Sequence, residues 1–166
     1  MYSWFGWIES SSLSVWTRES TSLLAYPAIL SAHAIGMGVA AGINAAIALR
    51  LLGAAPGIPI GEMRRYAIVV WIGFAINALS GLMLLIAYPT KALTNPVFYL
   101  KLSLIAAGMG TFVLLDRALS RDSTRADAWS STARRWIGVA SLVSWGGAIV
   151  AGRLLAYTYR HIMAGH

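Results

Sequence analysis

The sequence predicts an all-α integral membrane protein, a four-helix up-down bundle with an N-terminal interfacial helix. Of its 166 residues, 58% are hydrophobic and only 11% are charged, whereas soluble domains carry about 25% charged residues. The hydrophobic residues gather in four runs, and each run is long enough for the roughly 20 helical residues that cross a bilayer. The chain also contains 7 Trp and 7 Tyr, which favour membrane–water interfaces.

The first element is the segment 1–22, which we expect to be an amphipathic helix lying on the membrane surface. Trp4, Trp7 and Trp16 fall near one side of such a helix, and the serines at 10–12 would meet water. The segment lacks the basic start and the continuous apolar stretch of a cleavable signal peptide. We therefore expect it to stay attached to the protein.

Four spans follow within a transmembrane domain at 23–160, and a short tail closes the chain at 161–166. The links between the spans are short, which favours antiparallel neighbours. Small residues recur at every fourth position of the first span, in one row through Gly38 and Gly42 and a second row through Gly36 and Ala40, so that helix backbones can approach closely. The spans are expected at about 23–50, 65–89, 96–116 and 134–159.

Arginine orients the predicted bundle. The net charge of +7 comes mostly from arginines in the links between spans, which indicates membrane topology and not nucleic-acid binding. The arginine-rich side is expected to face the cytoplasm, so that both termini face outward, toward the periplasm if the protein lies in a bacterial inner membrane. The arginines of that side are Arg50, Arg64, Arg65, Arg117, Arg121, Arg125, Arg134 and Arg135.

His33 lies about ten residues into the first span, in the outer half of the predicted bundle. A buried imidazole without a partner costs free energy, and ionisable side chains within spans usually mark a functional site. The structural alternative is a histidine that only bonds across helices, and Lys101 is close enough to a helix start to reach the outer interface. The side chains expected at the depth of His33 are Asn77, Ser80, Met83, Tyr99, Lys101, Arg153 and Tyr157.

Three chemistries fit this set of residues. In the first, His33 ligates the iron of one b-type haem, Arg153 and Lys101 bind the propionates, and the sixth position is taken by His161 or Met83 or stays open. In the second, His33 and a Tyr or Ser hydroxyl bind the two carbonyls of a quinone. In the third, His33 and methionine thioethers bind copper(I). The absence of cysteine excludes thiolate sites and disulfides.

Three stretches of the sequence together resemble a group of small bacterial four-helix inner-membrane proteins. They are "AHAIGMG", "SGLMLLIAYPTKALTNPVFYLKLSLI" and "GRLLAYTY". The group is distantly similar to the copper-resistance D domain, to HemJ-type protoporphyrinogen oxidases and to b-type cytochrome membrane proteins. The resemblance implies a four-helix fold and a role for His33, Lys101 and Arg153, and it implies no particular reaction. Its most specific residues are Ser80, Gly81, Pro89, Asn95, Pro96, Phe98 and Lys101.

Together these features predict an electron-transfer subunit of a redox complex, not a self-contained enzyme. We expect it to bind a single haem b, or a quinone, in the outer half of the bundle. It would then dock a periplasmic partner through its N-terminal segment and its C-terminal tail. The alternative from a different class of function is a cofactor-free accessory subunit of a larger membrane complex, and the third candidate is a copper(I)-handling protein. The expected partners are the lipid bilayer and other redox subunits, in a homo- or hetero-oligomer.

Overall fold

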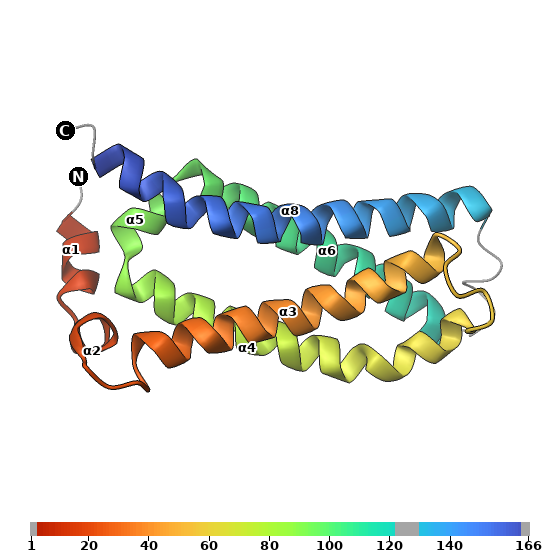
Figure 1. Cartoon of the computed structure of the whole chain (residues 1–166), viewed down its shortest axis with the longest axis horizontal. Helices are drawn as coiled ribbons and strands as arrows, with labels where there is room; N and C mark the ends of the chain where they lie inside the picture. The colour runs from red at the N-terminus through yellow and green to blue at the C-terminus, as the bar shows by residue number, and fades with distance from the viewer. Residues whose placement is uncertain (1–2, 122–129, 164–166) are drawn as a thin grey trace.

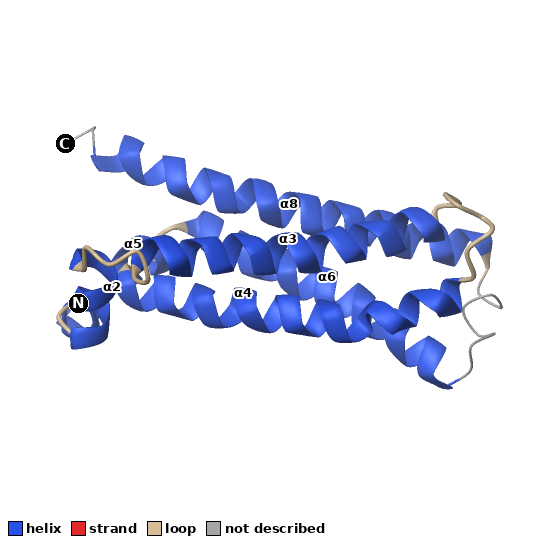
Figure 2. Ribbon diagram, turned by 60° about the horizontal axis from the view of Figure 1, so that its bottom comes forward, coloured by secondary structure: helices blue, strands red, loops and turns tan. Residues whose placement is uncertain are grey.

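The structure, a computed structural model of the chain, describes residues 3–121 and 130–163 (Figure 1). Within these ranges the regular elements are all helices, joined by short loops, and no strand occurs (Figure 2). Four stretches are long and apolar enough to cross a membrane, namely Tyr26–Leu51, Ile60–Ala87, Pro96–Leu119 and Ser131–Leu155. The prediction of an all-helical chain with four apolar, membrane-length helices is therefore confirmed.

Proline residues decide where several of these helices begin. Helix α3 covers Tyr26–Leu51 and has a proline in its first turn, where the missing N–H costs no hydrogen bond. It begins three residues later than the expected residue 23 because residues 23–25 form a turn. Beyond its end Gly53 has a φ of 107°, a conformation that glycine adopts without strain.

The second apolar stretch has two parts, a 3₁₀ helix η1 at Ile60–Tyr66 and the α-helix α4 at Ala67–Ala87. A short helix α5 follows at Pro89–Leu93. Helix α6 covers Pro96–Arg121 and α8 covers Ser131–Met163. Both extend beyond the predicted spans because polar residues continue the helix past its apolar part, and at 1.5 Å per residue α8 is about 50 Å long.

The four long helices lie lengthwise beside one another. Helix α3 packs along α4 and along α8, and α6 packs along α8 (Figure 1). Aromatic contacts add a link between α4 and α6, since the ring centroids of Trp71 and Phe112 are 6.1 Å apart. The buried apolar cluster draws on all four helices and includes Ala40, Ile47, Leu51, Val70, Phe112, Leu115 and Trp145.

Only one of the two rows of small residues in α3 forms a helix contact. A Cβ on Gly36 would lie 2.7 Å from both the backbone nitrogen of Asn77 and the carbonyl oxygen of Gly73, so α3 and α4 approach closely there. Gly38 and Gly42 belong to the other row, and a Cβ on either would have no atom within 4 Å. The row through Gly36 therefore packs against α4, and the row through Gly38 faces away.

The N-terminal segment forms two short helices instead of one. Helix α1 covers Ser3–Glu9 and α2 covers Ser12–Glu19. The break follows from the serines between them, because the Ser11 hydroxyl accepts a hydrogen bond from the backbone nitrogen of Ser14 and so caps α2. Both helices lie at the end of the molecule where α3 begins and α4 ends (Figure 1).

Candidate functional site

His33 is joined to two neighbouring helices through both of its ring nitrogens. Its Nδ1 lies 3.0 Å from the carbonyl oxygen of Asn77 and 3.2 Å from Ser80 Oγ, both on α4. Its Nε2 lies 3.1 Å from Lys101 Nζ on α6. The Asn77 side chain completes the contact by donating from Nδ2 to the His33 carbonyl at 2.9 Å. We call His33, Asn77, Ser80 and Lys101 the polar cluster.

The hydrogen-bond partners assign the tautomer of His33. A carbonyl oxygen can only accept, so Nδ1 carries the hydrogen that points to Asn77. Nε2 then presents its lone pair to the Lys101 ammonium, which donates to it. The Ser80 hydroxyl donates to the carbonyl of Ile76 at 2.6 Å, and its oxygen remains able to accept. An ammonium has three N–H donors, so Lys101 keeps donors beyond the one that it gives to His33.

Two glycines leave the room that the polar cluster occupies. A Cβ on Gly81 would lie 3.1 Å from His33 Cε1, and a Cβ on Gly152 of α8 would lie 3.7 Å from Lys101 Cε. A methyl group at position 81 would press on the imidazole ring, whereas one at position 152 would make ordinary van der Waals contact with the lysine stem. The sequence analysis named Gly81 only for the family resemblance and gave neither glycine a part in the site. The available signal was that Gly81 lies four residues after Asn77, on the same face of a helix.

The structure brings together four of the predicted site residues, and it places the others elsewhere. Arg153 is exposed and forms no hydrogen bond with the described residues, although its neighbour Gly152 faces Lys101. Tyr157 is 62% exposed, and Tyr99 is 52% exposed and donates to the Leu93 carbonyl at 2.9 Å. Met83 is half-buried on α4, and the side chain of His161 lies outside the described part of the chain.

Metal-ligating side chains do not converge in the described ranges. Among these residues no three His, Asp or Glu side chains lie close enough together to hold a metal ion. Met37 lies one helical turn from His33, which makes it a candidate thioether ligand for copper(I), and it packs against the apolar cluster. Within the described part of the chain, His33 is therefore an imidazole that belongs to no such group.

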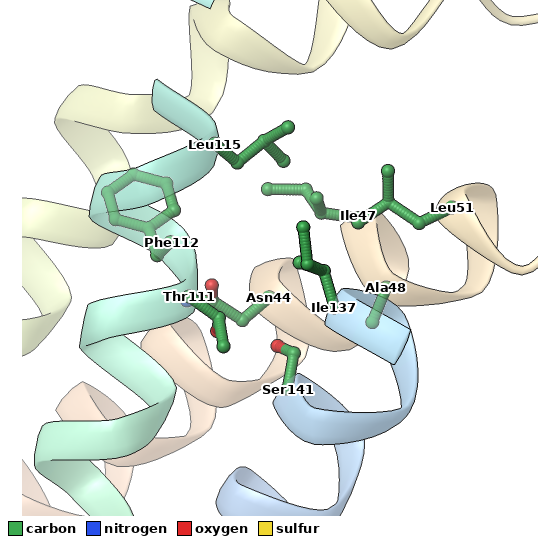
Figure 3. Close-up of a pocket in the computed structure, with 9 residues that line it drawn as sticks. All are labelled: Asn44, Ile47, Ala48, Leu51, Thr111, Phe112, Leu115, Ile137 and Ser141. Atoms are coloured by element: carbon green, nitrogen blue, oxygen red, sulfur yellow. The ribbon is translucent and has the colours of Figure 1, made fainter. Parts of the chain in front are cut away.

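A second group of polar side chains lies nearer the opposite end of the molecule. Asn44, Thr111 and Ser141 line a small pocket between α3, α6 and α8, together with apolar side chains (Figure 3). The Asn44 amide donates to the Ala40 carbonyl of its own helix at 2.8 Å. The Thr111 hydroxyl likewise donates to the Gly108 carbonyl, at 2.7 Å. This pocket contains no ionisable group, so it offers less chemistry than the polar cluster, and the sequence analysis did not identify it.

Comparison with protein-family models, curated proteins and solved structures finds no match to this chain. The resemblance to small four-helix inner-membrane proteins therefore stays a prediction.

Proposed function

We propose that the protein is a membrane-integral subunit that binds the headgroup of a quinone at the polar cluster. The observation that carries the proposal is the hydrogen bond between Lys101 Nζ and His33 Nε2, on helices that would both cross the membrane. Within the described residues, neither side chain forms a hydrogen bond or an ion pair with a carboxylate, so the ammonium has no fixed anion to satisfy it. A charge in a span without such a partner favours a ligand that supplies acceptor oxygens.

A quinone carbonyl matches the donors of this cluster. Lys101 can donate one hydrogen to His33 and another to a ligand oxygen at the same time, since an ammonium has three. An ammonium beside a carbonyl oxygen stabilises negative charge that develops there on reduction. His33, hydrogen-bonded to Lys101, is placed to pass a proton to it or to take one from it. The rest of a quinone is apolar and suits the apolar, membrane-length helices that carry the cluster.

Haem b fits the cluster less well than a quinone does. The hydrogen bond from His33 Nδ1 to a carbonyl oxygen is the arrangement that orients many metal-bound imidazoles. The nitrogen that would bind iron is Nε2, however, and Lys101 already occupies its lone pair at 3.1 Å. Among the cofactors, haem therefore ranks after quinone, and copper(I) after haem.

The proposed setting is an up-down bundle in a bacterial inner membrane, with α1 and α2 on the periplasmic side. The arginines near the other end, including Arg64, Arg65 and Arg135, support this orientation because positive residues are retained in the cytoplasm. His33 would then lie about 10 Å below the start of α3, from the rise of 1.5 Å per residue. In this setting the chain would exchange electrons through the quinone with redox subunits in the membrane or the periplasm.

The proposal is tested by titrating decyl-ubiquinone into the purified full chain in lipid nanodiscs and following tryptophan fluorescence. Lys101→Met removes a charge-assisted hydrogen bond worth about 1.5–3 kcal/mol, so we expect Kd to rise roughly 10- to 150-fold. Arg153→Met is the matched control, because it removes a cation from the exposed side of α8, and its Kd should stay at the wild-type value. Equal affinity in wild type and Lys101→Met would refute the assignment. A Soret band in the purified protein would show that the bound cofactor is haem and not a quinone.

A cofactor-free accessory subunit is the second candidate, favoured by the exposed row of small residues on α3. Gly38 and Gly42 have open space where a side chain would be, and Ala34 and Ala46 of the same row are also exposed. Such a surface permits a helix of another subunit to approach closely. Co-purification with a membrane partner that is lost in Gly38→Leu/Gly42→Leu, without any quinone binding, would favour this candidate.

A further inference from the structure

The N-terminal segment turns polar side chains toward the bundle and large apolar side chains away from it. Ser14 and Thr17 of α2 are 0% and 1% exposed, whereas Trp4 and Trp7 of α1 are 80% and 75% exposed. A helix that packs on the core of a soluble protein has the opposite distribution, because burial of apolar surface drives that packing. The inverted distribution indicates that the surroundings of α1 and α2 are apolar.

Hydrogen bonds hold the inner side of this segment to the end of α4. The carbonyl oxygen of Ala87 accepts from Ser14 Oγ at 3.4 Å and from Arg18 Nη1 at 3.3 Å. Arg18 also donates from Nη2 to the Glu9 carbonyl at 2.9 Å, and the Glu9 carboxylate accepts from the backbone nitrogen of Thr90 at 3.3 Å. A cation at the C-terminal end of a helix is favoured by the partial negative charge there. These contacts fix the orientation of α1 and α2.

The outer side of the segment carries mainly aromatic and aliphatic side chains, and its one exposed charged side chain among the described residues is Glu19, at the end of α2. This outer side lies beside the start of α3 and the end of α4 (Figure 1), at the level where the membrane-length helices end. Tryptophan concentrates at this level in membrane proteins because its ring is apolar and its N–H can donate to lipid oxygens. The exposed large side chains, which we call the tryptophan surface, are Trp4, Trp7, Leu13, Trp16, Leu23 and Leu24.

We propose that the tryptophan surface inserts into the phospholipid interface of the leaflet at this end of the bundle and anchors the end of α4 there. The partner of this surface is lipid, which replaces the expectation that the N-terminal segment docks a periplasmic protein. A protein partner would have to cover large apolar side chains in the same layer where lipid surrounds the adjoining helices. This inference is independent of quinone binding, because it rests on the outer face of α1 and α2.

The absence of cysteine from the sequence makes a direct test simple, since one introduced cysteine carries one nitroxide label. The full chain is reconstituted into phosphatidylcholine vesicles with a label at Trp7→Cys or Leu23→Cys. Ser12→Cys is the control, because Ser12 is exposed on the same segment and lies outside the tryptophan surface. Electron paramagnetic resonance then compares collisions with oxygen, which enters lipid, and with a water-soluble nickel chelate.

We expect the labels at positions 7 and 23 to lie about 5–10 Å below the lipid phosphates, and the label at position 12 to collide freely with the chelate. Helix content by circular dichroism equal to wild type verifies that the labelled chains are folded. Labels at 7 and 23 that meet the chelate as often as the label at 12 would overturn the proposal. The vesicles contain no quinone and no other protein, so this outcome leaves the proposed quinone site unaffected.

Discussion

Substitution of Gly36 by alanine tests the close approach of α3 and α4 on which the polar cluster depends. The new Cβ would lie 2.7 Å from two backbone atoms of α4, the nitrogen of Asn77 and the carbonyl oxygen of Gly73. Backbone atoms cannot rotate away as a side chain does, so the helices themselves must separate. Ordinary contact begins at 3.4 Å, which means a local separation of about 0.7 Å at a packed interface.

The expected cost has two parts. Overpacking of a tight interface costs about 1–3 kcal/mol. The separation also weakens the hydrogen bonds from His33 Nδ1 to the Asn77 carbonyl and from Asn77 Nδ2 to the His33 carbonyl, and interhelical bonds in membranes contribute about 0.6 kcal/mol each. Together these terms predict that Gly36→Ala lowers the free energy of unfolding by about 2–4 kcal/mol.

Gly38→Ala is the matched control, because it makes the same chemical change two residues further along the same helix. A Cβ at Gly38 has no atom within 4 Å, so it meets no steric obstacle. The gain in helix propensity from glycine to alanine, up to about 1 kcal/mol, is common to both variants and cancels in their difference. The difference in unfolding free energy between the two variants therefore reports the helix contact alone.

The measurement is unfolding of the purified chain in mixed micelles with a rising mole fraction of dodecyl sulfate, followed by circular dichroism. We expect the unfolding midpoint of Gly36→Ala to fall well below that of Gly38→Ala, which should lie close to wild type. Equal midpoints for the two variants, or a lower midpoint for Gly38→Ala, would refute the packing of α3 on α4 described here.

Two further predictions concern contacts away from the polar cluster. Gly108→Ala places a methyl group 2.8 Å from Trp145 Nε1, so the buried ring must shift. In the same assay, the free energy of unfolding should fall by about 1–3 kcal/mol. Gly110→Ala is the control, because its Cβ meets no atom within 4 Å, and it should behave as wild type. Arg18→Met removes a donor to the Ala87 carbonyl, worth about 1.5–3 kcal/mol for a charged group. Limited proteolysis should then cut α1 and α2 faster than in wild type, and an unchanged cutting rate would contradict the role of Arg18.

The number of long apolar helices and their approximate positions could be predicted from the sequence, because a membrane-crossing chain must satisfy its backbone hydrogen bonds within each segment. Only helices of sufficient apolar length meet that condition, so length and hydropathy alone indicate them. The need of His33 for polar partners was also predictable, since an imidazole at that depth has no water. Asn77, Ser80 and Lys101 were among the partners expected from helix direction and depth.

The rotation of each helix about its own axis could not be read from the sequence. Lys101 faces His33 while Arg153 is exposed, and Gly36 packs against α4 while Gly38 meets nothing. In a soluble protein the polar face of a helix reveals which side meets water. Here lipid tails and neighbouring helices are both apolar, so periodicity cannot tell one side from the other, and only side-chain packing between the helices decided which residues meet.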